Sequence, residues 1–352
     1  MAELKILSFG AGAIGTYVGG SLALAGAELV FVEQPAALEE IRRRGLRLDL
    51  TRDGRRESKE AAILEPSSIV VVGSIPDALR YGPFDAGLFA LKSFDTPAAL
   101  EAMKPFARDL PPILCLSNGV DNEPAIANVL GSDRVIPATV TSAIGRRGPG
   151  DIILERLRGL GIYSGHALSH KLTGAANSAL LNPQPFANAA AMKWSKMLTN
   201  LMANPTSAIL DMTPAEVYAD PRLYKLEVGM LRECLAVMRV QSIPVVDLPG
   251  TPVRALAAAV RMPFWLSKPI LSRAAGTGRG EKMPSFYIDL HAGRGKSEVE
   301  YLHGAVVRAG MQFGVATPVN RILTETLMAL TRGQLSLSEF ARQPEKLLRR
   351  LA

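Results

Sequence analysis

The middle of the chain carries a lysine and two asparagines at a regular spacing of four residues: Lys196, Asn200 and Asn204. In a helix, this spacing places the three side chains on one face. The residues between them are largely apolar, and a polar group on an apolar face needs a partner if it is buried. A bound substrate would supply such partners. In the alternative interpretation, the lysine extends to solvent and the asparagines cap the helix before Pro205.

Further along the chain, Ser285 and the segment from Ser297 to Glu300 form another group of polar residues. Ser297 and Glu300 have the spacing of a helix capping box, which is a purely structural motif. This motif leaves Glu298 without a role. Its carboxylate could be stabilised by the helix dipole alone, or it could point into a cleft between two domains. The residues alone leave both hypotheses open.

A glycine-rich segment follows the first apolar run of the chain: Gly10-Ala11-Gly12-Ala13-Ile14-Gly15. A strand is predicted before it and a helix after it, which is the context of a dinucleotide-binding turn. The first glycine would permit the tight turn, the second would let the backbone approach a pyrophosphate, and the third would let the helix pack closely. The phosphates would then lie at the helix N-terminus, which favours negative charge. A glycine-rich turn without a ligand is the structural alternative.

Glu33 and Gln34 stand at the end of the second predicted strand, where the adenosine ribose of a dinucleotide lies. A carboxylate there can accept hydrogen bonds from both ribose hydroxyls, which favours NAD. The 2′-phosphate of NADP would be repelled by Glu33 and would prefer an arginine. Arg42, Arg43 and Arg44 follow on the next predicted helix and could compensate, although a solvated helix face explains them as well.

Short apolar runs predict strands in the first half of the chain, at residues 4–9, 29–32, 69–72, 88–91, 113–116 and 135–140. Helical patterns separate several of them, and strands that alternate with helices predict a parallel sheet covered on both faces. We therefore expect a Rossmann-type, doubly wound α/β domain over residues 1–185. An alternating run at 46–50, followed by the turn residues Arg52-Asp53-Gly54, predicts a small inserted hairpin.

Long helical patterns dominate the rest of the chain, at residues 187–210, 223–241, 297–313 and 318–330. The stretch Asn182-Pro183-Gln184-Pro185 is expected to break regular structure and to mark the boundary to an all-α domain over residues 186–352. The segment 253–281 predicts helices with a glycine-rich mobile loop. Its apolar and basic residues could meet a partner or a membrane surface, but burial against the helical domain is the interpretation that we favour.

Taken in chain order, the motifs of this sequence resemble those of the ketopantoate reductase family. They are Gly10-x-Gly12-x-x-Gly15, Leu91-Lys92-Ser93, Ser117-Asn118-Gly119, Trp194-x-Lys196-x-x-x-Asn200-x-x-x-Asn204-Pro205, Ser285 and Ser297-Glu298-x-Glu300. The resemblance spans nearly the whole chain. It implies an oxidoreductase that transfers hydride from a reduced nicotinamide to the ketone of 2-dehydropantoate, giving pantoate for pantothenate and coenzyme A synthesis.

The resemblance also implies roles for individual residues. Lys196 matches the general acid, and an ammonium suits this role because it stabilises a developing alkoxide and supplies a proton. Glu298 matches a carboxylate that helps to hold the substrate and the lysine. The same comparison implies substrate contacts for Asn200, Asn204 and Ser285, and a place at the rim of the cofactor site for Lys92 and Asn118.

Two departures from the family pattern bear on the cofactor and the substrate. The family typically uses NADPH and usually has an arginine where this chain has Gln34 beside Glu33, so the resemblance implies NADPH while the carboxylate favours NADH. The stretch 253–280 is longer than in compact members, which leaves open another branched 2-keto acid as substrate. A catalytically silent redox sensor is a further alternative, although a sensor would need no proton donor such as Lys196.

The composition argues against several other classes of protein. The chain has 352 residues, 48% of them hydrophobic, which is enough for two cores, and no apolar run is long enough to span a bilayer. The net charge of +7 comes from scattered basic residues, so a nucleic-acid partner is not expected. Cys115 and Cys234 predict buried free thiols, and His166 and His170 lack further ligands that would complete a metal site.

The start of the chain lacks the features of an export signal. We therefore expect a cytoplasmic enzyme that acts on a small 2-keto acid, without a metal, a nucleic-acid partner or a membrane partner. A homodimer stays open.

Overall fold

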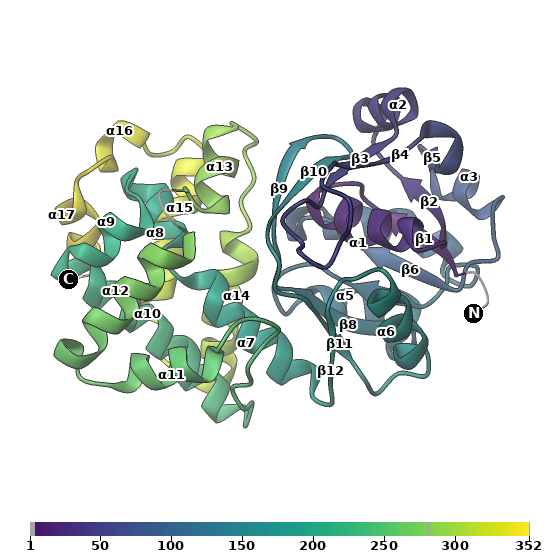
Figure 1. The fold of residues 1–352 in the computed structure, drawn as a ribbon. Helices are drawn as coiled ribbons and strands as arrows, with labels where there is room; N and C mark the ends of the chain where they lie inside the picture. The colour runs from purple at the N-terminus through teal and green to yellow at the C-terminus, as the bar shows by residue number, and fades with distance from the viewer. Residues whose placement is uncertain (1–3, 280–281, 352) are drawn as a thin grey trace. The chain divides into compact units, whose positions relative to one another are not determined.

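The computed structural model describes residues 4–279 and 282–351, and the chain divides into two compact units (Figure 1). One unit contains the chain up to Lys193 together with Leu248–Thr251, and the other contains Trp194–Asp247 and the chain from Pro252 onward. The sequence places the domain boundary after residue 185. The division in the structure falls after Lys193, within helix α7 (Ala189–Leu201).

A largely parallel sheet forms the centre of the first unit, with the strand order β12-β11-β8-β7-β6-β1-β2-β5 and an antiparallel β11–β8 pair. The α/β fold predicted for this part of the chain is confirmed. All the strands predicted from apolar runs are present. Such runs are a good signal here because the strands of a parallel sheet are covered on both faces and are therefore continuously apolar. The strands are β1 (Lys5–Phe9), β2 (Glu28–Val32), β5 (Val70–Val72), β6 (Ala86–Phe89), β7 (Ile113–Cys115), β8 (Val135–Val140), β11 (Leu160–Tyr163) and β12 (Pro183–Phe186).

Helix α1 (Ala13–Leu24) contacts this sheet and also a second, smaller sheet with the strand order β4-β3-β10-β9 (Figure 1). A Cβ atom on Gly20 would lie 2.8 Å from Leu48 Cδ2, so the helix and the second sheet pack closely. The strands of this sheet are β3 (Leu46–Asp49), β4 (Ala62–Leu64), β9 (Ala143–Gly148) and β10 (Asp151–Arg156). The other helices of the unit are α2 (Pro35–Arg44), α3 (Ile75–Leu79), α4 (Thr96–Met103), α5 (Asn122–Leu130) and α6 (Ser169–Ser178).

The structure differs from two of the predictions for this unit. The predicted hairpin exists as the antiparallel β3–β4 pair, but it is part of a larger sheet with β9 and β10. Strand β9 was not predicted, because its arginines and glycines interrupt the alternation of apolar and polar residues. The stretch around Pro183 and Pro185 was expected to break regular structure, yet it forms strand β12. This strand lies at the sheet edge, where a proline without an N–H group is tolerated.

Helices form the second unit, as predicted for the C-terminal part of the chain. Helix α10 contacts α9, α11, α14 and α15 and buries most of its apolar side chains. The helices are α8 (Asn204–Leu210), α9 (Pro214–Ala219), α10 (Pro221–Val240), α11 (Val253–Arg261), α12 (Phe264–Arg279), α13 (Ser285–His291), α14 (Val299–Phe313), α15 (Pro318–Thr331), α16 (Leu337–Phe340) and α17 (Pro344–Arg349). No helix within residues 4–279 and 282–351 has both the length and the apolar composition needed to cross a bilayer.

The prediction of one helix over residues 187–210 is wrong. The helix ends at Leu201 and a new one begins at Asn204, with Ala203 in the left-handed region at φ +52°. Asn204 therefore does not share a helix with Lys196. The cause is Pro205, which lacks an N–H group and is suited to the first turn of a helix but not to its interior.

Two further expectations for this unit are modified. Ser297 was expected to cap its helix together with Glu300, but its hydroxyl accepts the N–H of Val299 at 3.2 Å, and α14 begins only at Val299. The glycine-rich part of segment 253–281 is helical as far as Arg279, and Gly280 and Glu281 lie outside the described residues. This segment was expected to be buried. Leu271 is buried, whereas Trp265 is 75% exposed.

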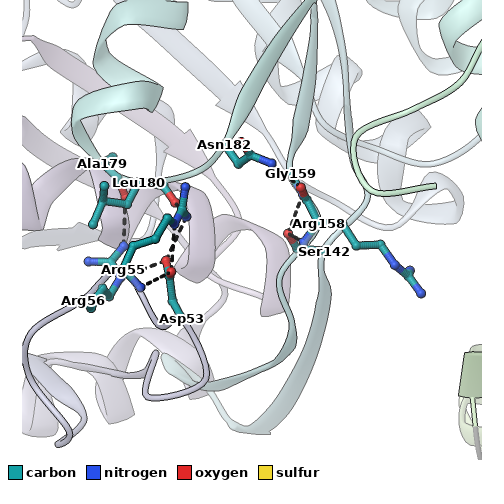
Figure 2. Close-up of polar contacts among 9 residues, drawn as sticks. All are labelled: Asp53, Arg55, Arg56, Ser142, Arg158, Gly159, Ala179, Leu180 and Asn182. Carbon is teal, nitrogen blue, oxygen red and sulfur yellow. Dashed lines mark hydrogen bonds and ion pairs between the residues drawn. The ribbon is translucent and has the colours of Figure 1, made fainter.

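The loop between β3 and β4 binds the chain that follows α6 (Figure 2). Asp53 is only 2% exposed and binds the guanidinium of Arg55 through both carboxylate oxygens at 2.9 Å. Arg55 also donates to the carbonyl of Leu180, and Arg56 donates to the carbonyl of Ala179 at 2.9 Å. These two carbonyls come directly after a helix, where carbonyl groups lack partners within the helix. The loop thus closes one end of α6 with positive charge.

Replacement of Asp53 by asparagine is expected to destabilise the first unit at neutral pH. Burial acts to raise the pKa of the Asp53 carboxyl, but the hydrogen bonds and charges of Arg55 and Arg56 outweigh it and hold the pKa below its ordinary value. A carboxyl with a lowered pKa stabilises the fold above its unfolded pKa, and this stabilisation is lost as the pH falls through the folded pKa. Denaturant unfolding at pH 7 should show a loss of roughly 1.5–3 kcal/mol.

The same measurement on Asp77→Asn serves as the control, because Asp77 is 48% exposed and its carboxylate is bound by the Ser74 hydroxyl at 2.6 Å and lies 3.6 Å from the guanidinium of Arg80. A surface pair of this kind contributes about 0–1 kcal/mol. The Asp53→Asn difference should shrink as the pH falls below about 4, the ordinary pKa of aspartate. A difference that stays constant with pH would show that the carboxylate charge is not responsible.

Candidate active site

The glycine-rich turn between β1 and α1 has the geometry that a dinucleotide site requires. Gly10 has a φ of +94°, which side chains rarely allow. A Cβ atom on Gly15 would lie 1.9 Å from the carbonyl oxygen of Gly10, so only glycine fits there. A Cβ atom on Gly12 would meet nothing within 4 Å, so this glycine is at the open side of the turn. The backbone there is accessible to a pyrophosphate at the N-terminus of α1.

Glu33, directly after β2, lies against this turn. Its carboxylate accepts the N–H of Ala11 within the glycine-rich segment and the N–H of Gln34 at 2.9 Å. Gln34 itself is exposed. The arginines of α2 have other contacts, since Arg42 donates to the carbonyl of Val71 at 3.0 Å and the next two arginines pair with a glutamate of their own helix. Glu33 thus places a carboxylate against the turn, while the arginines of α2 make contacts elsewhere.

The turn lies at the place where the strand order reverses. Strand β1 has β2 on one side and β6 on the other, and ligands of open α/β sheets bind at the carboxyl ends of strands on either side of such a point. Leu91 follows β6, and its Cδ2 would lie 2.8 Å from a Cβ atom on Gly10. Lys92 and Asn118, the two predicted rim residues, follow β6 and β7 and are both partly buried.

A buried polar network joins the two segments that carry Lys92 and Asn118. Asn122, on α5, is 3% exposed and donates to the carbonyl of Asn118 at 2.7 Å and to the hydroxyl of Ser93 at 3.2 Å. The Ser93 hydroxyl donates to the same Asn118 carbonyl at 3.0 Å, and Thr96 donates to Asn122 Oδ1 at 2.7 Å. Asn122 thus connects the segments after β6 and β7. Sequence analysis missed it, because a polar residue in the first turn of a helix looks like a cap.

Lys193 is a second residue that sequence analysis did not single out. Its side chain is 6% exposed, and its ammonium lies 2.6 Å from Glu123 Oε1 and 2.7 Å from the carbonyl oxygen of Ser117. Burial acts to lower the pKa of Lys193, but the negative charge of Glu123 outweighs it and the pKa is raised. Lys193 is therefore a charged residue that holds the segment after β7. The sequence pattern does not indicate that Lys193, three residues before Lys196, is buried.

Replacement of Asn122 by alanine is expected to weaken cofactor binding, because it removes the amide that holds the Asn118 carbonyl and Ser93 in place. A loss of about tenfold in affinity corresponds to roughly one net hydrogen bond. Calorimetric titration with reduced nicotinamide cofactor measures it. Asn128→Ala on the exposed side of the same helix is the matched control. Equal affinity of the two variants would exclude Asn122 as a support of the cofactor site.

In the second unit, hydrogen bonds bring together Asn200, Asn204 and Ser285. Asn204 is the first residue of α8 and is 3% exposed. Its Nδ2 donates to the carbonyl of Asn200 at 3.1 Å and to the hydroxyl of Ser285 at 3.4 Å. Its Oδ1 accepts the N–H of Phe286 at 3.1 Å. Because a backbone N–H must face an oxygen, the orientation of this amide is fixed.

Lys196 and Glu298 also lie in this unit. Lys196 is partly buried, one helical turn before Asn200 on α7. Glu298 is 2% exposed and precedes α14, and its carbonyl accepts the N–H groups of Tyr301 and Leu302 at 3.0 Å. The roles assigned to both side chains stay predictions. The helix start that carries Glu298 gives its carboxylate a favourable dipole in either interpretation.

A fully buried carboxylate stands next to these residues, and sequence analysis missed it. Glu227, on α10, is 0% exposed. Its Oε2 accepts the N–H of Ala203 at 2.7 Å, and its Oε1 accepts the hydroxyl of Thr206 at 2.5 Å. No pattern in the sequence distinguishes Glu227 from Glu233, the other glutamate of α10, since the partners of Glu227 come from a helix break that was not predicted.

The two cysteines and the histidines His166 and His303 are buried or hydrogen-bonded within the protein. Cys115 and Cys234 are buried free thiols, as predicted, and burial raises the pKa of both. The Nε2 atom of His166 lies 2.8 Å from the carbonyl oxygen of Asp133. His303 is fully buried, and burial lowers its pKa to about 3, so its ring is neutral at physiological pH. Within residues 4–279 and 282–351, no group of His, Cys, Asp and Glu side chains is arranged to hold a metal ion.

Comparisons with known proteins agree with this fold. Residues 6–164 match the family described as "Ketopantoate reductase PanE/ApbA", and residues 188–331 match its C-terminal counterpart. A 2-dehydropantoate 2-reductase from Pyrococcus horikoshii is 24% identical over 325 residues, which cover 91% of this chain and 95% of the relative.

Solved structures extend this likeness to the fold. A PanE/ApbA family ketopantoate reductase from Ralstonia eutropha has a TM-score of 0.76 and 26% identity, covering 94% of this chain and 99% of its own. D-mandelate dehydrogenase, solved with NADH and anilino(oxo)acetate, has a TM-score of 0.74 at 21% identity with the same coverage, 94% and 99%.

The family matches and the named relatives, together with the fold and the glycine-rich turn, identify a nicotinamide-dependent oxidoreductase that acts on a CH–OH group. Because the two family matches together span most of the chain, it belongs to the ketopantoate reductase family.

Proposed function

We propose that this protein reduces 2-dehydropantoate to pantoate with hydride from a reduced nicotinamide cofactor and with Lys196 as the general acid. The observation that carries the proposal is the hydrogen-bonded group of Asn200, Asn204 and Ser285, from α7, α8 and α13. These are the residues that the family resemblance assigns to the substrate. Lys196 lies one helical turn from Asn200.

The reduction of a ketone needs a hydride at carbon and a proton at oxygen. When bound, the reduced nicotinamide supplies the hydride. The ammonium of Lys196 would donate a hydrogen bond to the keto oxygen, stabilise the alkoxide as negative charge develops, and transfer its proton to it. The neutral amine left behind recovers a proton from water. In this mechanism, Glu298 helps to hold the ammonium and the substrate.

The amide of Asn204 positions the hydroxyl of Ser285, the group that would bind the substrate carboxylate. Since its Oδ1 faces the N–H of Phe286, its Nδ2 is directed toward the hydroxyl of Ser285. The other Nδ2 hydrogen goes to the carbonyl of Asn200, so the donor left for a carboxylate is the O–H of Ser285, which accepts from the amide through its oxygen. Ser285 would therefore bind the carboxylate of the keto acid, with Asn200 and Asn204 at the carboxylate and hydroxyl groups.

The first unit would hold the cofactor. Gly10, Gly12 and Gly15 give the turn its accessible backbone, and the N-terminus of α1 favours the pyrophosphate. The segment Gly10-Ala11-Gly12-Ala13-Ile14-Gly15 would bind the phosphates, Glu33 and Gln34 would lie at the adenosine ribose, and Lys92 and Asn118 at the nicotinamide side.

The proposal is tested by the loss of absorbance of reduced nicotinamide when ketopantoate is added, with NADPH and NADH in parallel. Other branched 2-keto acids and one with a phenyl group belong in the same series, because D-mandelate dehydrogenase has a similar fold. Oxidation specific to ketopantoate would support the proposal. Activity restricted to another keto acid would keep the mechanism and replace the substrate. No loss of absorbance with any keto acid would favour a catalytically silent redox sensor.

Replacement of Lys196 by alanine is expected to lower kcat by about 10²–10⁴-fold, the usual contribution of a general acid. The affinity for the cofactor should not change, because the turn that binds it lies in the first unit. Single-turnover kinetics and a cofactor titration measure the two effects. Lys225→Ala, an exposed lysine of the same unit, is the control. Normal turnover without the Lys196 ammonium would remove it from the mechanism.

For the cofactor, we propose that Glu33 lets this chain accept NADH at least as well as NADPH. The carboxylate lies against the glycine-rich turn, where a 2′-phosphate would meet its negative charge. The resemblance to the family implies NADPH instead.

Replacement of Glu33 by glutamine is therefore expected to raise the ratio of kcat/KM for NADPH to that for NADH, by about tenfold for one removed like-charge contact. Glu39→Gln, on the exposed side of α2, controls for the change in net charge. An unchanged ratio would mean that Glu33 does not face the ribose.

A further inference from the structure

The break between α7 and α8 places a strained residue directly before Asn204. Ala203 has φ +52° and ψ 2°, in the left-handed region that costs a residue with a Cβ atom about 1–2 kcal/mol. Ala203 is also only 2% exposed, so the packed residues around it restrict a change of its backbone conformation. Such a conformation persists only where the surroundings hold it.

Glu227 supplies that hold. Its two carboxylate oxygens bind donors on both sides of Asn204: the N–H of Ala203 at 2.7 Å and the hydroxyl of Thr206 at 2.5 Å. The carboxylate is 0% exposed, and a buried carboxylate is tolerated only when it is well hydrogen-bonded. The contact therefore fixes the backbone at the break and the first turn of α8 at once.

The side chain of Asn204 depends on this backbone. Its amide contacts the carbonyl of Asn200, the hydroxyl of Ser285 and the N–H of Phe286, with distances of 3.1, 3.4 and 3.1 Å. A relaxed break would rotate the start of α8 and move the amide away from Ser285. Substrate contacts would then be lost without any change in the residues that make them.

We propose that Glu227 is a positioning residue, a buried carboxylate that sets the break between α7 and α8 and thereby places Asn204 beside Ser285 for binding of the keto acid. The inference rests on the proposed function of Asn204 and Ser285. The role proposed for Glu227 is exerted through the chain, since its two carboxylate oxygens bind the N–H of Ala203 and the hydroxyl of Thr206.

Glu233 provides a matched comparison on the same helix. Its carboxylate accepts the N–H groups of Val319 at 2.8 Å and of Asn320 at 2.9 Å, at the start of α15. Glu227 and Glu233 are thus both partly or fully buried carboxylates of α10 that bind the backbone at a helix start. Only Glu227 binds the helix that begins with Asn204.

The test compares Glu227→Gln with Glu233→Gln. Glutamine has the same shape but only one acceptor oxygen and no charge, so the hydroxyl of Thr206 would have to turn from donor to acceptor and both hydrogen bonds would weaken; Glu227→Gln should therefore raise KM for the keto acid by about tenfold. The cofactor affinity should stay within about twofold, because the cofactor turn lies in the first unit. Glu233→Gln should lower the melting temperature but leave KM within about twofold. An equal effect of both variants on KM would overturn the proposal.

Thr206→Val is the milder variant in case Glu227→Gln fails to fold. Valine has nearly the shape of threonine and removes only the hydroxyl donor to Glu227. It should raise KM in the same direction, by about threefold to tenfold. A folded Thr206→Val protein with unchanged KM would contradict the role of this contact.

Replacement of Ala203 by glycine gives a rescue experiment. Glycine adopts a positive φ without the Cβ penalty, so it should recover part of the KM increase when combined with Glu227→Gln. Alone, it should leave KM within about twofold. If Glu227 only stabilised the fold, the effects of Ala203→Gly and Glu227→Gln on KM would be independent of each other. Additive effects on KM in a double-mutant cycle would therefore argue against the proposal.

Amide hydrogen exchange separates a failure of this inference from a failure of the proposed function. If the wild-type protein reduces no keto acid, the proposed function fails, and exchange still reports on the break. Loss of protection at the N–H groups of Ala203 and Ser207, which bind Glu227 and the carbonyl of Ala203, in Glu227→Gln but not in Glu233→Gln would show that Glu227 holds the break. Equal protection in both variants would overturn that hold.

Discussion

Charged side chains that are buried and bound to the main chain hold the loops in both units. A buried charge is costly unless it is fully hydrogen-bonded, so such a residue stabilises one arrangement of its partners and penalises the others. Lys193 binds the carbonyl of Ser117 beside the predicted nicotinamide rim, and Glu227 binds the N–H of Ala203 beside the predicted substrate amide. In each case, a residue that would not touch a ligand fixes the backbone of one that would.

The glycine-rich turn depends on a different constraint, which is close approach. Helix α1 contacts two sheets and passes its own preceding strand at Gly15, where a side chain would overlap the carbonyl of Gly10. Small residues let the helix approach this closely, and the sheets then hold its N-terminus in a fixed position at the carboxyl end of β1. An anion site made of backbone groups needs this rigidity, since it has no side chains that could adjust.

The sequence predicts those features whose cause is local. The first strands, the glycine turn and the helical C-terminal part follow from apolar periodicity and from glycine at fixed positions. The second sheet as a whole was not predicted: β9 and β10 pair locally with each other, but the sheet forms only because β10 also pairs with β3, which lies about a hundred residues earlier in the chain. Strand β12 was missed because its prolines are acceptable only at an edge, which is a property of the sheet and not of the segment.

The candidate site divides in the same way. The spacing of four brings Asn204 into contact with Asn200, but the interpretation of Lys196, Asn200 and Asn204 as one helix face fails at Ala203. Pro205 carries the signal for the break, although it does not reveal which direction the chain takes after it. That direction is set by Glu227, which lies on another helix.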